Sequence, residues 1–429
     1  MRQKQRGTVM VMALAVLTGL VTILAAAAAS QSVAFRAGSN RMEDRRAEIA
    51  AEAAAHYVMA NLVSQSKTAT NLQDDWASLG QNGDERFTIG DAAFRIEILD
   101  SASRLNLNSL NQAQLQQLNL TDEQIDSLLD WRQAGQTARA NGAKDEYYNT
   151  LTEPYNAALR QLRTVDELLL VRGFTAADLF KTIDEQGGNA SYKPMGTSTI
   201  TTTASGTTTT IPVLYDLLTI DSVSQDLGAN GQPKLNVNSP AVTLPRLVQA
   251  GLAPNIAAAI IQRRASGNPF TSIGQVLALP GVSIQNQATI LDNLSITGTA
   301  RVEGRLNLNT VTEDVLNTVP SITPDIVRGI VQQQATGFTR LGELAAVPGM
   351  TSTLLQGMAD RFAVNSQTFL VRIVAEVGRT QKAYEATISI EGQAPRIIRM
   401  TEAPADAQTR WAWATETTTD TPIVEASSQ

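Results

Sequence analysis

Residues 8–35 read TVMVMALAVLTGLVTILAAAAASQSVAF, a stretch of the chain without a single charged side chain. A helix needs about 20 apolar residues to cross the hydrocarbon core of a bilayer, so this stretch is long enough to span one. A helix also satisfies its own backbone hydrogen bonds, as lipid requires. We therefore predict a transmembrane helix over residues 8–35 and take it as the element that decides the fold.

Cations lie directly before this stretch. Residues 1–7 read MRQKQRG and contain Arg2, Lys4 and Arg6 but no acid. Because Lys and Arg favour the cytoplasmic side of a membrane, we expect a cytoplasmic N-terminus, one membrane crossing, and the bulk of the chain outside. The alternative is a cleaved secretory signal peptide, for which the alanines at 25–29 offer a cleavage site, although its apolar region is normally only ~7–15 residues long.

The composition argues against nucleic-acid binding and against catalysis. The net charge is −7, whereas affinity for nucleic acids comes mostly from neutralising phosphates. The chain has no cysteine and one histidine, His56, in an alanine-rich run where a structural role is expected. No glycine-rich phosphate loop, zinc-ligand spacing or nucleophile elbow is present. We therefore expect that the protein is not an enzyme.

Helical and β patterns surround the central part of the chain. The helix is predicted to continue to residue 66, with an apolar face of Ile49, Ala53, Tyr57, Ala60 and Leu62 that needs a partner. Residues 86–100 alternate around a Gly-Asp turn and predict a β-hairpin, and residues 368–400 predict three strands. The segment at 186–210 is rich in Gly, Ser and Thr and predicts a linker, and residues 401–429 predict a disordered tail.

Three motifs repeat between the β regions: RLNLNS at 104–109, KLNVNS at 234–239 and RLNLNT at 305–310. Asparagine side chains hold turns, and the following Ser or Thr is a plausible N-cap, so each motif predicts the start of a helical unit. Each unit ends in a glycine-containing turn, which predicts a helix-hairpin-helix arrangement. The turn residues are Asn106, Asn108, Asn236, Asn238, Asn307, Asn309, Gly173, Gly281 and Gly349.

These repeats resemble the tandem hairpins of competence-type DNA receptors, which bind phosphate through a Gly-hydrophobic-Gly turn at a helix start. None of the four turns keeps both glycines: they read Gly251-Leu252-Ala253, Gly281-Val282-Ser283, Ser321-Ile322-Thr323 and Gly349-Met350-Thr351. Nearby cations are few, namely Arg263, Arg264 and Arg328. The motifs therefore favour a structural or protein-contacting role over DNA binding.

Taken together, the residues resemble the K-type minor pseudopilins of type II (general) secretion. The resemblance rests on KQRG before the apolar helix, on RLNLNSL at 104–110, on DWRQAGQTARANGAKDEYYN at 130–149 with VDELLLVRG at 165–173, and on RLNLNTVTEDVLNTVP at 305–320. It implies cleavage by a prepilin peptidase after Gly7 and N-methylation of Thr8. Met12 stands where most pilins carry a glutamate, and the K-type also lacks that acid.

The family's helical insert also implies a calcium site, from which this chain departs. Gln133 and Gly135 replace two aspartates, and Lys144 stands in place of a glutamate. Calcium prefers six to eight oxygen ligands, several of them carboxylates. We therefore expect no cofactor; the acids left for calcium, should it bind, are Asp130, Asp145 and Glu146.

The predicted fold class is α+β: a long N-terminal transmembrane helix packs on a small antiparallel sheet, as in pseudopilins, with inserted all-α helix-hairpin-helix repeats. The predicted segments are a leader (1–7), the transmembrane helix (8–35), a periplasmic helix with the first strands (36–108), a helical insert (109–185), a linker and return segment (186–233), two repeats (234–297 and 298–366), C-terminal strands (367–400) and the tail (401–429).

The resemblance implies an inner-membrane tip subunit that helps initiate a pseudopilus for protein export across the outer membrane. Its expected partners are other minor pseudopilins, the inner-membrane secretion platform and the prepilin peptidase, with nucleic acid disfavoured. The alternative is a membrane-anchored periplasmic DNA-binding protein for DNA uptake, or a type IV pilus component.

Overall fold

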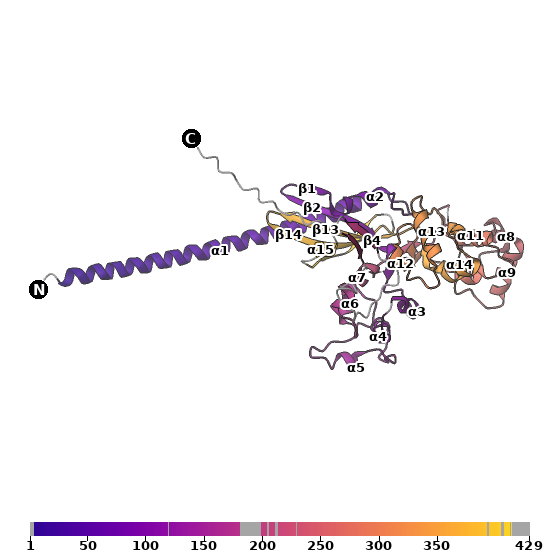
Figure 1. The fold of residues 1–429 in the computed structure, drawn as a ribbon, viewed down its shortest axis with the longest axis horizontal. Helices are drawn as coiled ribbons and strands as arrows, with labels where there is room; N and C mark the ends of the chain where they lie inside the picture. The colour runs from indigo at the N-terminus through magenta and orange to yellow at the C-terminus, as the bar shows by residue number, and fades with distance from the viewer. Residues whose placement is uncertain are drawn as a thin grey trace, which may run out of the picture.

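The computed structural model describes residues 4–118, 120–180, 199–203, 206–210, 213–228, 230–392, 394–404, 407–411 and 413. Helix α1, Lys4–Leu62, projects as a rod from the rest of the molecule (Figure 1). It begins inside the predicted leader, and it ends at Leu62 instead of residue 66. A turn follows the helix, in which Gln65 N donates to the carbonyl of Leu62 at 3.2 Å and Ser66 Oγ accepts from the amides of Thr68 and Ala69.

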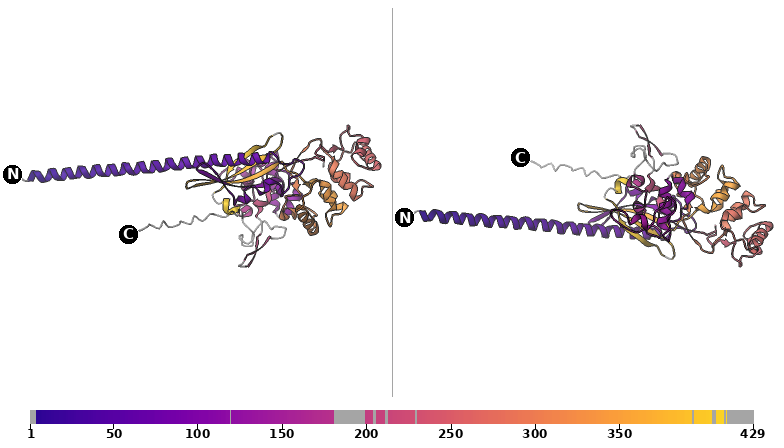
Figure 2. Two further views of the ribbon diagram at one scale, coloured as in Figure 1. Left: turned by 90° about the horizontal axis from the view of Figure 1, so that it is seen from above. Right: turned by 90° about the horizontal axis from the view of Figure 1, so that it is seen from below.

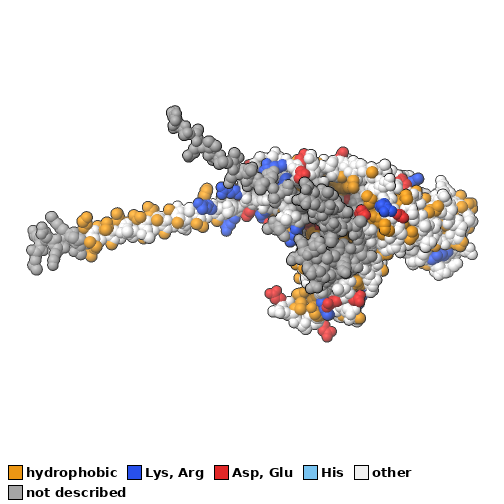
Figure 3. Space-filling model, viewed as in Figure 1, with side chains coloured by type: hydrophobic (Ala, Val, Ile, Leu, Met, Phe, Trp, Pro, Cys, Tyr) orange, Lys and Arg blue, Asp and Glu red, His pale blue; other side chains and the backbone are white. Residues whose placement is uncertain are grey.

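The N-terminal half of α1 exposes many apolar side chains to its surroundings, as one face of the helix shows (Figure 3). Met12, Leu17 and Leu24 are 66%, 61% and 72% exposed. In the described part of the chain, α1 is the one helix long and apolar enough to cross a membrane. This half therefore fits a single-pass membrane anchor.

The C-terminal half of α1 packs on the sheet through a stripe of small side chains. The buried residues of this stripe are Ala47, Ala50, Ala51, Ala54, Ala55, Val58 and Leu62. The predicted apolar face was only partly right: Leu62 is buried, but Ile49 is 51% exposed and Tyr57 39% exposed. Alanine lets the helix axis approach the strands closely, so the contact face is marked by the spacing of the alanines rather than by the largest apolar residues.

A five-stranded antiparallel sheet supports α1, in the order β1-β2-β13-β14-β15. The strands are β1 Arg86–Ile89, β2 Ala92–Asp100, β13 Thr368–Val377, β14 Thr380–Ser389 and β15 Arg396–Glu402. Both predicted strand regions are confirmed. The α+β fold class is confirmed as well: the long helix lies on this sheet, and the helical units lie between β2 and β13. Short elements α2 (Asp75–Ser78), η1 (Gln81–Gly83) and η2 (Ser101–Ser103) flank these first two strands.

The predicted disordered tail is wrong for its first part. Helix α15, Ala407–Arg410, follows β15, and Trp411 and Trp413 are buried against Val374 and Ala383 of the sheet. Trp413 Nε1 also donates to Glu97 at 3.1 Å. Two indole rings bury enough apolar area to hold a polar, Thr- and Ala-rich segment in place. Residues 414–429 lie outside the described residues.

Three helical units lie between the β regions, and each is closed by a pair of parallel two-residue strands. Leu105–Asn106 (β3) pairs with Leu218–Thr219 (β6), Leu235–Asn236 (β8) with Leu294–Ser295 (β9), and Leu306–Asn307 (β11) with Phe362–Ala363 (β12). We call residues 105–219, 235–295 and 306–363 the first, second and third unit. In every unit the Leu-Asn of the repeated motif is the opening strand.

The units contain short helices joined by turns. The first holds α3 Gln112–Leu115, η3 Gln116–Leu118, α4 Asp122–Arg132, α5 Asp145–Tyr148, η4 Val165–Leu170, α6 Ala176–Phe180 and α7 Leu214–Leu217. The second holds α8 Leu244–Gln249, α9 Pro254–Ala265, α10 Ile273–Leu277 and α11 Ile284–Asn293. The third holds α12 Glu313–Leu316, α13 Pro324–Gln334, η5 Leu341–Ala346, α14 Ser352–Met358 and η6 Ala359–Arg361.

The second unit lies farthest from the N-terminus of α1, and the third unit lies between it and the sheet (Figures 1 and 2). The helices α3 to α6 of the first unit form a separate lobe beside the sheet (Figure 1). Most buried apolar residues of the three units nevertheless belong to one continuous core, separate from the core between α1 and the sheet.

The predicted linker and return segment at 186–233 needs one correction. Residues 213–228 are structured: Leu214, Leu217 and Leu218 are buried in the core of the first unit, and β7, Val223–Gln225, pairs with β10, Arg301–Glu303. The first unit therefore closes at β6, not at residue 185. Residues 199–203 and 206–210 form an antiparallel pair, β4 and β5, and residues 181–198 lie outside the described residues. The long insertion between α6 and α7 separates the two parts of the first unit in the sequence. The closing strand of this unit is therefore hard to recognise from the sequence.

Candidate functional site

The second asparagine of each motif joins three separate segments of its unit. In the second unit, Asn238 Nδ2 donates to the carbonyls of Phe270 and Ile296 at 2.9 and 3.0 Å, and its Oδ1 accepts from Phe270 N at 2.8 Å. The same bonds recur in the other units, on Asn108 with Leu162 and Ile220, and on Asn309 with Phe338 and Val364. These asparagines are structural clamps between the opening strand, the middle turn and the closing strand.

The first asparagine of each motif turns the backbone. Its Oδ1 accepts from the amide of the second asparagine at 2.9 Å in the first unit, 2.9 Å in the second and 3.1 Å in the third. The donating residues are Asn108, Asn238 and Asn309, and the accepting residues are Asn106, Asn236 and Asn307. The predicted role of these side chains as local turn formers is confirmed.

The predicted turn glycines adopt the left-handed conformation that favours glycine. Gly173, Gly281 and Gly349 have φ of 87°, 83° and 83°. Gly251 follows the same pattern with φ of 91°, and Ser321 occupies it with φ of 66° in spite of its side chain. A new helix begins three residues after each of these positions, which matches the predicted sequence of turn and helix.

At the N-termini of the helices that follow these turns, side chains of the chain itself bind the backbone amides that a phosphate would need. Ser283 Oγ accepts from Asn286 N at 3.3 Å, Thr323 Oγ1 from Ile326 N at 3.4 Å and Thr351 Oγ1 from Leu354 N at 3.3 Å. A DNA-binding hairpin would aim such amides at a phosphate instead. At three of the four turns, the residue in place of the second glycine therefore caps the helix and uses an amide that DNA would need.

The nearby cations are also engaged within the unit. Arg264 donates to the carbonyls of Ser239 and Val242 at 2.6 and 3.0 Å. Arg263 lies over the ring of Phe270, with 4.3 Å to the centroid, and donates to Gln275 at 2.6 Å. Both guanidinium groups therefore stabilise the second unit itself. Arg132 and Gln334 bind the turn carbonyls of the other two units in the same way as Arg264.

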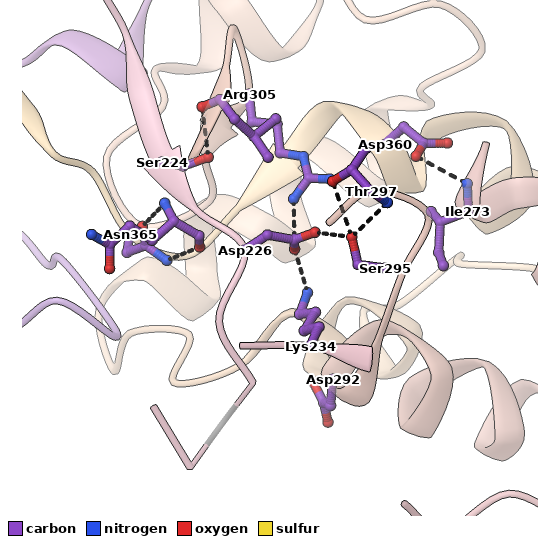
Figure 4. Close-up of polar contacts among 12 residues, drawn as sticks. Ser224, Asp226, Lys234, Ile273, Asp292, Ser295, Thr297, Arg305, Asp360 and Asn365 are labelled. Carbon is purple, nitrogen blue, oxygen red and sulfur yellow. Dashed lines mark hydrogen bonds and ion pairs between the residues drawn. The ribbon is translucent and has the colours of Figure 1, made fainter. Parts of the chain in front are cut away.

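Asp226 connects the second and third units, and sequence reasoning missed it (Figure 4). Its carboxylate pairs with Lys234 Nζ at 3.0 Å and with Arg305 at 2.9 Å, and it accepts from Ser295 Oγ at 2.7 Å. Burial opposes ionisation of Asp226, but Lys234 and Arg305 outweigh it and hold its pKa well below the ordinary value. The signal in the sequence was the cation that opens each of the three repeated motifs, of which those at positions 234 and 305 bind Asp226.

Asp130, one of the acids left for calcium, is held by partners from the chain. Asp130 is 1% exposed; its carboxylate pairs with Arg139 at 2.6 Å and accepts from the Arg139 amide at 2.8 Å. Lys144 Nζ donates to the carbonyls of Asp130 and Gln133 at 2.5 and 2.6 Å. The ammonium group of Lys144 therefore binds two carbonyl oxygens that could otherwise serve as ligands of a metal ion.

The other two calcium candidates do not complete a ligand set. Asp145 accepts from the Ala157 amide at 2.8 Å and from Gln136 at 2.7 Å, and Glu146 is exposed. Within the described ranges, no group of three or more His, Cys, Asp and Glu side chains could hold a metal ion. His56 lies exposed on α1. Asp130, Asp145 and Glu146 therefore do not fit a calcium ion.

Replacing Lys144 with methionine is expected to destabilise the first unit, whereas removing calcium with EDTA is expected to leave wild-type stability unchanged. Hydrogen bonds from a charged group typically contribute about 1.5–3 kcal/mol, and this change removes two of them. The midpoint of urea unfolding of the full chain in detergent measures both effects. A lower midpoint after EDTA treatment of the wild type would contradict this reading of the site.

Gly7 and Thr8, the predicted cleavage and methylation positions, lie within the first turns of α1. They are consecutive residues of a continuous helix that leads directly into the exposed apolar half. The structure does not test their processing, so the cleavage and the methylation stay predictions.

Comparisons with known proteins match the chain to one family. Residues 103–182 match the family model described as type II secretion system (T2SS), protein K. Type II secretion system protein K of Pectobacterium carotovorum subsp. carotovorum is 25% identical over 207 residues, which cover 42% of this chain and 62% of that protein. Type II secretion system protein K of Aeromonas hydrophila is 26% identical over 204 residues, which cover 41% of this chain and 60% of that protein.

The matched part of the chain spans less than two thirds of the length of these relatives. A solved chain in the GspK-GspI-GspJ complex from the enterotoxigenic Escherichia coli type 2 secretion system is 13% identical, with a TM-score of 0.43 and coverage of 85% of this chain and 99% of that chain. The family match at 103–182 covers the motif RLNLNS, the calcium-site departures and the turn at Gly173. Through these residues, the chain is similar to the type II secretion system protein K family.

Proposed function

We propose that this protein is a minor pseudopilin of a type II secretion system, which acts by assembly and not by catalysis. The observation that carries the proposal is the protein K match at residues 103–182 in a chain whose α1 has one exposed apolar half and one half packed on a sheet. An exposed apolar helix requires lipid or other apolar helices around it.

In this proposal, the N-terminus of α1 lies in the cytoplasm, the apolar half crosses the inner membrane, and the sheet and three units lie in the periplasm. The cations before the helix favour that orientation. Met12 provides no acid to pair with the amine of a neighbouring subunit. This absence supports a position at the tip of the pseudopilus, where the protein would initiate assembly.

The proposed partners are other minor pseudopilins, the inner-membrane secretion platform and the prepilin peptidase. The exposed apolar residues of α1 would contact the equivalent helices of the other pseudopilins. The engaged arginines and capped turns of the repeats argue against the alternative of DNA uptake, because they leave few groups for phosphate.

Mass spectrometry of the protein from its native host is expected to show cleavage after Gly7 and one added methyl group on the amine of Thr8. A Gly7→Val variant provides the control, since a β-branched residue at the cleavage position should block processing and leave residues 1–7 attached. A wild-type chain that keeps residues 1–7, or that is cut among the alanines at 25–29, would contradict the proposal.

A further inference from the structure

The third unit uses its repeated motif to bind a carboxylate from elsewhere in the chain. Asn307 Nδ2 donates to Asp100 Oδ2 at 2.8 Å, and Thr310 Oγ1 donates to the same oxygen at 2.6 Å. Asp100 ends strand β2 and is 3% exposed. The first asparagine and the final hydroxyl of the motif thus form a pair of donors that holds one carboxylate oxygen.

The first unit carries the same pair of side chains, and both are engaged within the chain. Ser109 Oγ donates to the carbonyl of Asn106 at 3.0 Å. Asn106 Nδ2 donates to Ser222 Oγ at 3.2 Å. Gly304 lies directly on Ser109, where even a Cβ atom would collide with the serine side chain. Ser222 and Gly304 flank the paired strands β7 and β10, so a β-ribbon of the chain itself closes this face.

The second unit leaves the equivalent donors open. Asn236 and Ser239 are both half-buried and line an open groove of about 1000 Å³. Ser239 Oγ accepts from Ala241 N at 3.3 Å, which keeps its own proton available for an acceptor. Across the residues that the structure describes, no acceptor bonds to Asn236 Nδ2, whereas Asn106 Nδ2 has one acceptor and Asn307 Nδ2 has two, Asp100 and the carbonyl of Thr70.

The charge of the groove is opposite to that of the chain as a whole. Its lining contains two cations, Lys234 and Arg246, and no Asp or Glu, although the chain carries 41 acids against 34 Lys and Arg. Lys234 is paired with Asp226, whereas Arg246 is exposed on α8. The apolar side chains of Leu235, Ala241 and Ala250 also line the groove. A ligand with a carboxylate and some apolar surface would be complementary to this groove.

We propose that the groove of the second unit is a docking site for an acidic loop of another protein chain, whose Asp or Glu would take the position that Asp100 takes on the third unit. The carboxylate would accept from Asn236 Nδ2 and Ser239 Oγ, with Arg246 close by. The argument rests on two occupied copies of the same motif within one chain, and it does not depend on the proposed role in secretion.

Disulfide tethering tests the proposal on the full chain in detergent, because the chain has no cysteine of its own. Ala241→Cys introduces one thiol at the exposed rim of the groove. Two isotope-distinguished peptides copy residues 98–103 behind a Cys-Gly leader, one with the natural Asp100 and one with Asp100→Asn. They compete for the thiol in a glutathione buffer, and the ratio of the two mixed disulfides is measured by mass spectrometry.

We expect about a tenfold excess of the Asp peptide on the Ala241→Cys chain, since a charge-assisted hydrogen bond is roughly twice as strong as a neutral one. Adding Asn236→Leu should bring the ratio close to one. A Gln285→Cys chain carries its thiol at an exposed position of α11 outside the groove, and it should show no preference between the two peptides. Equal amounts of the two peptides on the Ala241→Cys chain, or a preference that survives Asn236→Leu, would overturn the proposal. Circular dichroism confirms that each variant is folded.

Discussion

A chain carrying Asp226→Ala is expected to unfold with a free energy about 3–5 kcal/mol below that of the wild type, because the change leaves two buried cations without their partner. The side chains of Lys234 and Arg305 are only 5% and 13% exposed, so water cannot replace the lost carboxylate. Lys234 directly precedes the second unit and Arg305 directly precedes the third. The loss should therefore separate these two units before the sheet unfolds.

Urea unfolding of the full chain in detergent, followed by circular dichroism, measures the effect. Asp325→Ala is the matched control, since it also removes an aspartate-arginine pair, but one whose side chains are 70% and 73% exposed. Such exposed pairs contribute between about 0 and 1 kcal/mol. Similar midpoints for the two variants would show that the charges at Asp226 do not hold the units together.

The same carboxylate makes stability depend on pH. The pKa of Asp226 in the folded chain lies well below its ordinary value, because Lys234 and Arg305 outweigh the effect of burial. The stabilisation is therefore fully present above about pH 4, the pKa of an unfolded aspartate, and it is lost as the pH falls toward the folded pKa. The Asp226→Ala chain should lose less stability than the wild type between neutral pH and pH 3.

The repeated motifs made most of the helical region predictable. Side chains that act within a few residues, such as the turn asparagines and Gly281, leave a local signature, because their hydrogen bonds and φ angles depend on nearby backbone. The alternation of apolar and polar residues in β2 and β13 likewise predicted a sheet with one face on α1. What these patterns did not show is how distant segments meet: the closing strand of the first unit, β6, lies beyond a long insertion.

Contacts between side chains far apart in sequence were the other source of error. Asp226 lies in no repeated motif, and only its position between Lys234 and Arg305 gives it a role. The polar composition of the tail predicted disorder, yet Trp411 and Trp413 bury two large rings on the sheet. In α1, apolar size pointed to Ile49, whereas close packing selected the alanines. Each error involves a partner that is not local in the chain.

Replacing Asn309 with leucine is expected to destabilise the third unit by about 2–6 kcal/mol. Asn309 is 1% exposed, and its side chain binds both the amide and the carbonyl of Phe338. Leucine has nearly the same shape but no polar atoms, so both backbone groups of Phe338 would stay buried without these bonds. Each unsatisfied group of this kind costs about 1–3 kcal/mol.

The equivalent change in the second unit, Asn238→Leu, is the matched comparison. Asn238 makes the same set of bonds but is half-buried, so water can partly replace the lost partners and the expected cost is smaller. Hydrogen exchange of the full chain distinguishes the two variants, because the amide of Phe338 should lose protection only in Asn309→Leu and that of Phe270 only in Asn238→Leu. Because Asn309 also donates to Val364 beside the closing strand β12, its loss should further weaken the parallel pair that joins β12 to β11. Unchanged protection of Phe338 in Asn309→Leu would show that the asparagine clamp is not what holds the unit closed.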